Sequence, residues 1–124
     1  MPDLMTDIDQ QREIMQKSSL TDLTDQLLTA ARGASSGRSA QTVHGGHTKT
    51  LRQTVIALVA GQRLDEHENP GEATVHVLHG LVRLATDTAS CDGTGGDLLL
   101  VPDARHSLEA LQDSVVLLTV AKKM

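Results

Sequence analysis

Apolar residues recur with a helical period in one segment near the start of the chain. Leu23 and Leu27 lie four positions apart, and further leucines and alanines stand three or four positions away. This spacing is typical of the apolar face of an α-helix, and Ser19 or Thr21 can cap the start of that helix. The pattern therefore predicts an amphipathic helix over residues 19–33.

The hydrophobic pattern changes from residue 42 onward. Short aliphatic runs, among them TVIALVA, DLLLVP and SVVLLTVA, are separated by stretches that contain Gly, Pro, Asn and Asp. Several short strands with regular turns between them are typical of an all-β sandwich or barrel, so we expect one β-domain over residues 42–122. The polar residues 1–18 are expected to be frayed or loosely attached. The Ser- and Gly-containing stretch 34–41 is expected to be a flexible link.

The composition narrows the range of partners. The 124 residues amount to one domain. The net charge of -5 and the absence of Phe, Trp and Tyr argue against nucleic-acid binding, which uses a basic face and aromatic stacking. No apolar run approaches the ~20 residues that span a bilayer, and the acidic start lacks the features of a signal peptide. The single cysteine, Cys91, fits a reducing compartment, so we expect a cytoplasmic protein.

Two groups of glycine, proline and histidine residues stand at fixed spacings within the predicted β-domain. They are Gly61, His67 and Gly80, followed by Gly96, Pro102 and His106. Their order and spacing resemble the two sequence motifs of the cupin superfamily, with one residue fewer than usual between the proline and the second histidine.

The resemblance covers residues 42–122 and implies a small single-domain bacterial cupin of the RmlC-like type. Its fold would be one all-β barrel, also described as a double-stranded β-helix or jelly roll, with an N-terminal α-helix. The resemblance also implies a pocket for one small molecule inside the barrel. Because cupins often pair through edge strands, it further implies a homodimer.

The sequence departs from the cupin motifs where a metal would bind. The resemblance implies two histidines and one glutamate from the first motif, and one histidine from the second. His67 and His106 match, whereas Asn69 stands at the second histidine position and Ala73 at the glutamate position. Glu72 is adjacent to Ala73, but side chains alternate between the two faces of a strand. Two of the four expected ligands are therefore missing.

The remaining histidines make a weak metal site by themselves. Catalytic zinc usually keeps three protein ligands, and non-haem iron uses two histidines and a carboxylate. Asn69 could supply one weak oxygen, and Gln53 or His47 could reach the pocket from the preceding segment. The resemblance to small cupins suggests His47 as a third ligand. We therefore expect a pocket lined by His67, Asn69, His106, Gln53 and His47, and Fe, Mn, Ni or Zn, if bound, on His67, His106 and His47.

Two functional hypotheses remain open. The first, which the missing ligands favour, is a small cupin of unassigned activity that binds a small molecule inside the barrel, with or without a metal. The second is a metal-dependent enzyme, such as a dioxygenase or an isomerase that acts on a small polar acid. A sugar epimerase of this superfamily would use a tyrosine as its acid, and the chain contains none. The sequence assigns no catalytic residue.

Overall fold

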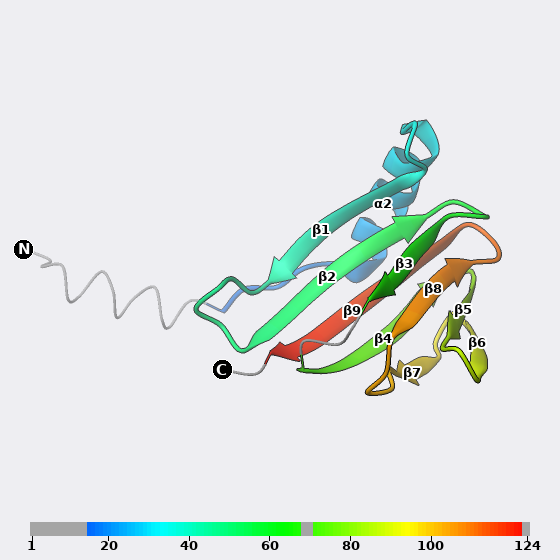
Figure 1. Ribbon diagram of the computed structural model, residues 1–124. Coiled ribbons are helices and arrows are strands. Elements are labelled where there is room, and N and C mark those ends of the chain that lie inside the picture. The colour runs from blue at the N-terminus through cyan, green and yellow to red at the C-terminus, as the bar shows by residue number, and fades with distance from the viewer. Residues whose placement is uncertain (1–14, 68–70, 123–124) are drawn as a thin grey trace, which may run out of the picture.

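The computed structural model describes residues 15–67 and 71–122 (Figure 1). The described residues form one helix followed by nine strands. The helix is α2 (Leu20–Gly33), and the strands are β1 (Arg38–His44), β2 (Leu51–Leu58), β3 (Arg63–His67), β4 (Gly71–His79), β5 (Leu81–Ala85), β6 (Ser90–Thr94), β7 (Leu98–Leu100), β8 (His106–Ala110) and β9 (Ser114–Lys122).

The strands form two antiparallel sheets. The larger sheet has the order β1-β2-β9-β4-β7, and the smaller sheet has the order β3-β8-β5-β6. Strands far apart in the sequence lie side by side in both, since β9 lies between β2 and β4, and β8 lies between β3 and β5. This architecture confirms the predicted all-β jelly roll with an N-terminal helix. No helix in the described part of the chain is long and apolar enough to cross a membrane.

The core has two layers because side chains alternate along the strands of the larger sheet. On β2, Ile56 and Leu58 pack between the two sheets, whereas Val55 and Ala57 pack under α2. We call the side that faces the smaller sheet the inner face, and the side that carries α2 the outer face. Since this end of β2 is covered on both sides, its sequence is a continuous apolar run, not an alternating one.

Burial decreases from one end of the barrel to the other. Residues 55–58 at the end of β2 are buried, as are residues 114–116 at the start of β9. At the opposite ends of the same strands, Leu51 and Arg52 are exposed and residues 117–122 are only partly buried. We call these the closed end and the mouth end. The mouth end is where β3 finishes and β8 begins, so both motif histidines belong to it.

Helix α2 agrees with the prediction from the sequence. Ser19 is the residue that caps it, because its Oγ accepts a hydrogen bond of 3.1 Å from the Asp22 N–H. Leu23, Leu27 and Ala31 form its buried face. Of the segment 1–18, residues 1–14 lie outside the described structure, and residues 15–18 are exposed and have no regular secondary structure.

The prediction of a flexible link over residues 34–41 was wrong at its second half. Strand β1 begins at Arg38, opposite Leu58 of β2. A tight turn at Gly37 precedes it, with a φ of 67° and a hydrogen bond of 2.9 Å from the Val59 N–H to its carbonyl. The polar sequence of β1 fits an edge strand, whose backbone bonds come from one neighbour while its side chains stay largely exposed.

Candidate functional site

His106 is the best-defined functional candidate at the mouth end. It opens β8, and only 5% of its surface is exposed. Its Nδ1 lies 2.9 Å from the carbonyl oxygen of Ala104. Because a carbonyl can only accept, Nδ1 carries the hydrogen in this bond, and in the neutral ring Nε2 carries the lone pair. This arrangement, in which a backbone carbonyl holds one nitrogen and thereby orients the other, is the one found in metal-binding and ligand-binding histidines.

A register shift brings the backbone of His67 opposite that of His106. Arg63 pairs with Glu109 and Leu64 with Leu108, but the next pair is His67 with His106. Strand β3 therefore contains one extra residue, a β-bulge of the kind that changes which residue faces a given partner. The structure describes the backbone of His67 but not its side chain, and Asn69 lies outside the described residues.

The position of the motif glutamate holds no carboxylate. Ala73 is 9% exposed and pairs with Val120 of β9, on the same face of β4 as the core residue Val75. Glu72 is exposed and lies on the outer face. Strand alternation thus separates the available carboxylate from the interior, as the sequence suggests.

The described residues do not make up a metal site of three ligands. No three His, Cys, Asp or Glu residues among residues 15–67 and 71–122 gather closely enough to hold a metal ion. His47 lies in the exposed turn between β1 and β2. Metal binding by His67, His106 and His47 therefore stays a prediction, and the donors described here do not by themselves fit a metal.

Gln53 does not lie on the inner face. It belongs to the same side of β2 as Val55 and Ala57, which pack under α2. Its Nε2 donates a hydrogen bond of 3.2 Å to Thr119 Oγ1 on β9. Strand alternation therefore turns its side chain away from the interior, and the structure does not bring it to His106. The position of Gln53 in the sequence, outside the cupin motifs, did not indicate which face of the sheet its side chain would occupy.

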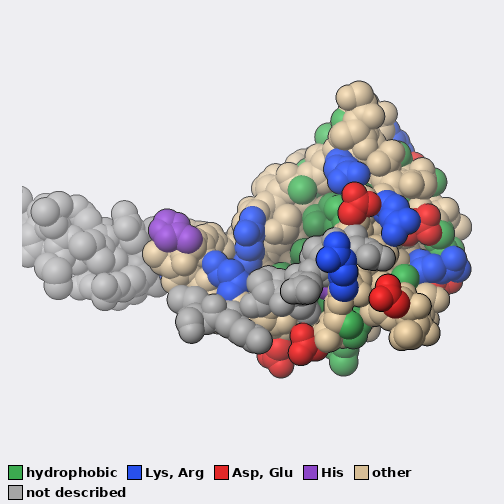
Figure 2. Space-filling view, in the orientation of Figure 1, with side chains coloured by type: hydrophobic (Ala, Val, Ile, Leu, Met, Phe, Trp, Pro, Cys, Tyr) green, Lys and Arg blue, Asp and Glu red, His purple; other side chains and the backbone are tan. Residues whose placement is uncertain are grey.

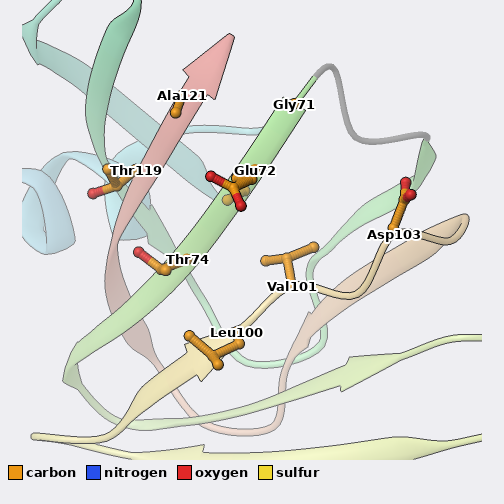
Figure 3. Close-up of a pocket in the computed structure, with 9 residues that line it drawn as sticks. Gly71, Glu72, Thr74, Leu100, Val101, Asp103, Thr119 and Ala121 are labelled. Atoms are coloured by element: carbon orange, nitrogen blue, oxygen red, sulfur yellow. The ribbon is translucent and has the colours of Figure 1, made fainter. Parts of the chain in front are cut away.

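A cavity that the sequence did not indicate lies along the edge of β4 near the mouth end (Figure 3). Its volume is about 590 Å³. Glu72, Thr74, Thr119 and Leu100 line it from β4, β9 and β7, and Asp103 lies across from them on the segment that follows β7. Most of these side chains stand on the outer face of the larger sheet, but Ala73 of the inner face and Val101, which packs against the core, also line the cavity.

Among the described residues, two carboxyl groups with a lowered pKa belong to ion pairs that join elements of the fold. The Ala60 N–H and the Arg32 guanidinium hold the pKa of Asp113 below its ordinary value, and the hydrogen-bonded Arg83 does the same for the pKa of Asp92. Figure 2 shows Lys and Arg side chains interspersed with Asp and Glu over one face of the molecule, with no basic field on that side. That face offers no continuous track for a phosphate backbone.

Comparison with known proteins identifies solved structures that share this fold. No family model and no curated protein matches the sequence. A solved structure of a protein of unknown function from Streptococcus pyogenes is 27% identical, with a TM-score of 0.66 over 73% of this chain and 79% of that one. An RmlC-like cupin from Desulfovibrio desulfuricans is 24% identical, with a TM-score of 0.66 over 87% of this chain and 97% of that one.

A cupin superfamily protein from Desulfitobacterium hafniense is 16% identical, with a TM-score of 0.64 over 69% of this chain and 78% of that one. Two of these three neighbours are named cupins, and all three differ widely from this chain in sequence but share its architecture. Together with the paired sheets and the two glycine–histidine motifs, they establish that this chain has the fold of a small, single-domain bacterial cupin of the RmlC-like type.

Proposed function

We propose that the protein binds one small molecule at the mouth end of its barrel, with His67 and His106 as the polar contacts. The observation that carries this proposal is the oriented, buried ring of His106, opposite the backbone of His67. A buried histidine whose ring is oriented by a backbone carbonyl is a suitable polar contact for a ligand.

The surroundings support a ligand with both apolar and polar groups. The inner-face residues toward the mouth end include the aliphatic Ala73, Leu118 and Val120, and also Thr54 and Arg52 of β2, which pair with Leu118 and Val120. Pockets of this kind gain affinity from apolar contact and orientation from a few polar groups. A small carboxylic acid or enolate suits a histidine pair, because a protonated imidazole donates to such an oxygen.

The alternative is a metal-dependent enzyme, such as a dioxygenase or an isomerase acting on a small polar acid. The orientation of His106 is equally suited to a metal, since its neutral Nε2 carries a lone pair. Ala73 at the carboxylate position weighs against this alternative. If a divalent Fe, Mn, Ni or Zn were bound, His67 and His106 would hold it, and it would polarise an oxygen of the bound acid.

Metal content separates the two functions. The protein would be purified without a histidine tag, incubated with Fe(II), Mn(II), Ni(II) or Zn(II), and analysed for bound metal beside the His67→Ala, His106→Ala and His47→Ala variants. His76→Ala is the matched control, because His76 is partly buried on the outer face. We expect no stoichiometric metal. Near-stoichiometric metal that is retained in His76→Ala but lost in His106→Ala would establish the metal-dependent alternative.

Ligand binding is tested by thermal shift with a panel of small carboxylic acids. A ligand that binds the folded state raises the melting temperature by mass action. We expect one or more acids to stabilise the wild type and His76→Ala, and to lose that effect in His106→Gln and His67→Gln. If stabilisation by every active acid survives both glutamine variants, the site lies elsewhere and the proposal fails.

A further inference from the structure

One row of residues crosses the inner face of the larger sheet at the mouth end. Arg52 of β2 pairs with Val120 of β9, and Val120 pairs with Ala73 of β4. Gly45 lies on the other side of Arg52, since a Cβ at Gly45 would be 3.1 Å from the Cβ and Cγ of Arg52. Arg52 is therefore the charged member of a row whose other residues are small or aliphatic.

The neighbours of Arg52 along β2 show which face of the sheet it occupies. Residues two positions apart on a strand share a face. Thr54 pairs with Leu118, which packs against the core between the two sheets, and its Oγ1 lies 3.3 Å from the Oγ1 of Thr42 on β1. Ile56, the next residue on that face, is buried in the same core. Arg52 thus belongs to the inner face, at the exposed end of β2.

This part of the inner face carries positive charge without a matching acid. Lys122 lies two residues beyond Val120 on the same face of β9, and its Nζ donates a hydrogen bond of 2.8 Å to the Gly46 carbonyl. None of the acidic side chains that the structure describes forms an ion pair with Arg52 or Lys122. Two cations on one concave face attract an anion and repel a metal ion.

The mouth end therefore presents two different polar groups, one on each sheet. Arg52 stays protonated at any ordinary pH, and its planar guanidinium can donate two parallel hydrogen bonds to a carboxylate. His106 on the smaller sheet is oriented by the Ala104 carbonyl. An arginine on a convex surface is usually satisfied by water, whereas the interior of a small barrel is where such folds hold one ligand.

We propose that Arg52 binds a carboxylate of the ligand and makes the mouth end selective for acids. This proposal rests on the proposed function, because it takes the mouth end as the ligand site. The ligand class is then a small acid with a second oxygen group, such as a dicarboxylate, a hydroxy acid or a keto acid. Its carboxylate pairs with Arg52, its second oxygen group lies at His106, and its carbon chain contacts Val120 and Ala73.

Matched acids and amides test the role of Arg52. Succinate, malate and lactate would be compared with succinamide, malamide and lactamide, which keep the size of each acid but lose its charge. Binding would be measured by thermal shift and by the Nε–H signal of Arg52 in NMR spectra. The proteins would be the wild type, Arg52→Gln, Arg52→Lys and Lys49→Gln. Lys49→Gln is the matched control, because it removes a positive charge from the exposed turn between β1 and β2.

We expect at least one acid, but not its amide, to stabilise the wild type and Lys49→Gln and to shift the Arg52 signal. Arg52→Gln should raise the Kd of that acid by about 10- to 100-fold, the usual effect of losing a hydrogen bond to a charged group. Arg52→Lys should raise it less, because lysine keeps the charge but not the planar fork. The melting temperature without ligand should not change, since Arg52 is exposed.

Three results would overturn the proposal. They are equal affinity of wild type and Arg52→Gln, equal binding of acid and amide, and no binding of any acid, with or without binding of glycerol 3-phosphate as a phosphate probe. Loss of acid binding in Arg52→Gln but not in His106→Gln or His67→Gln would support Arg52 and refute the histidine contacts of the proposed function. The reverse pattern would support the histidines and refute Arg52, so the two proposals can fail separately.

Discussion

The closed end and the mouth end of the barrel are built from the same strands but differ in how they are packed. At the closed end Leu58, Val77 and Ser114 are each at most 1% exposed. The buried Ser114 hydroxyl is fully used, since its Oγ accepts a hydrogen bond of 3.1 Å from the Leu81 N–H and lies 2.7 Å from the Gln112 carbonyl, to which it donates. At the mouth end the same strands carry partly buried or exposed residues.

This difference in packing suggests that the two ends contribute differently to the protein. The closed end supplies most of the buried apolar surface, and such surface is the main source of folding free energy. The mouth end holds a buried polar ring, that of His106. A barrel stabilised at one end can tolerate varied residues at the other, where Ala73 stands at the position that the cupin motif gives to a glutamate.

The largest effect is expected from substitution of glycines, which can be compared at two positions of the closed end. Gly80 at the closed end and Gly61 both have positive φ, 93° and 91°. A Cβ at Gly80 would press on Ser114 and on the Asp113 carbonyl, whereas a Cβ at Gly61 would meet nothing within 4 Å. We expect Gly80→Ala to lower the free energy of unfolding by about 2–5 kcal/mol and Gly61→Ala by about 1–2 kcal/mol. Equal losses in urea unfolding would show that the packing around Gly80 is not the reason for a glycine there.

A smaller difference is expected between two valines on the inner face of β9. Val116 is 1% exposed and belongs to the core, whereas Val120, four residues on at the mouth end, is only partly buried. We expect Val116→Ala to cost about 2–3 kcal/mol and Val120→Ala about 1 kcal/mol or less. Urea unfolding with an unchanged m-value would measure both. A larger loss at Val120 would contradict the burial gradient on which the comparison rests.

The smallest effect concerns the attachment of α2 at the closed end. Asp113 accepts hydrogen bonds of 2.9 Å from the Ala60 N–H and from Arg32 of α2, and these bonds lower its pKa. Since the folded-state pKa is depressed, the stabilisation is present above the unfolded value of about 4 and is lost as the pH falls through the folded value. Asp113→Asn should therefore flatten the acid side of a plot of melting temperature against pH.

The control for this titration is Asp87→Asn, at an exposed acid in the turn between β5 and β6. It should leave the acid limb as steep as in the wild type. If Asp113→Asn leaves the limb equally steep, the bonds to Ala60 and Arg32 contribute nothing to stability that depends on pH.

Much of the fold could be predicted because its determinants are local in sequence. The helical period with Ser19 before it specified α2, and short aliphatic runs between turn residues specified the strands. The spacing of Gly61, His67 and His106 was enough to indicate the cupin architecture. The burial of Ala73 and the exposure of Glu72 also followed from alternation along a single strand.

The parts that could not be predicted depend on a partner strand. Strand β1 begins at Arg38 because β2 supplies its backbone hydrogen bonds, although its own sequence is polar. The bulge in β3 that sets His67 opposite His106 exists only in relation to β8. The face occupied by Gln53 was decided by where α2 packs.

The sequence by itself thus determined that one helix precedes a series of short strands and which superfamily architecture they assemble into, since period and spacing are properties of the chain alone. The tertiary structure decided which side chains share a face, which residues oppose one another and where the surface is left uncovered. Those outcomes depend on register and packing between segments far apart in sequence, and one inserted residue is enough to change them.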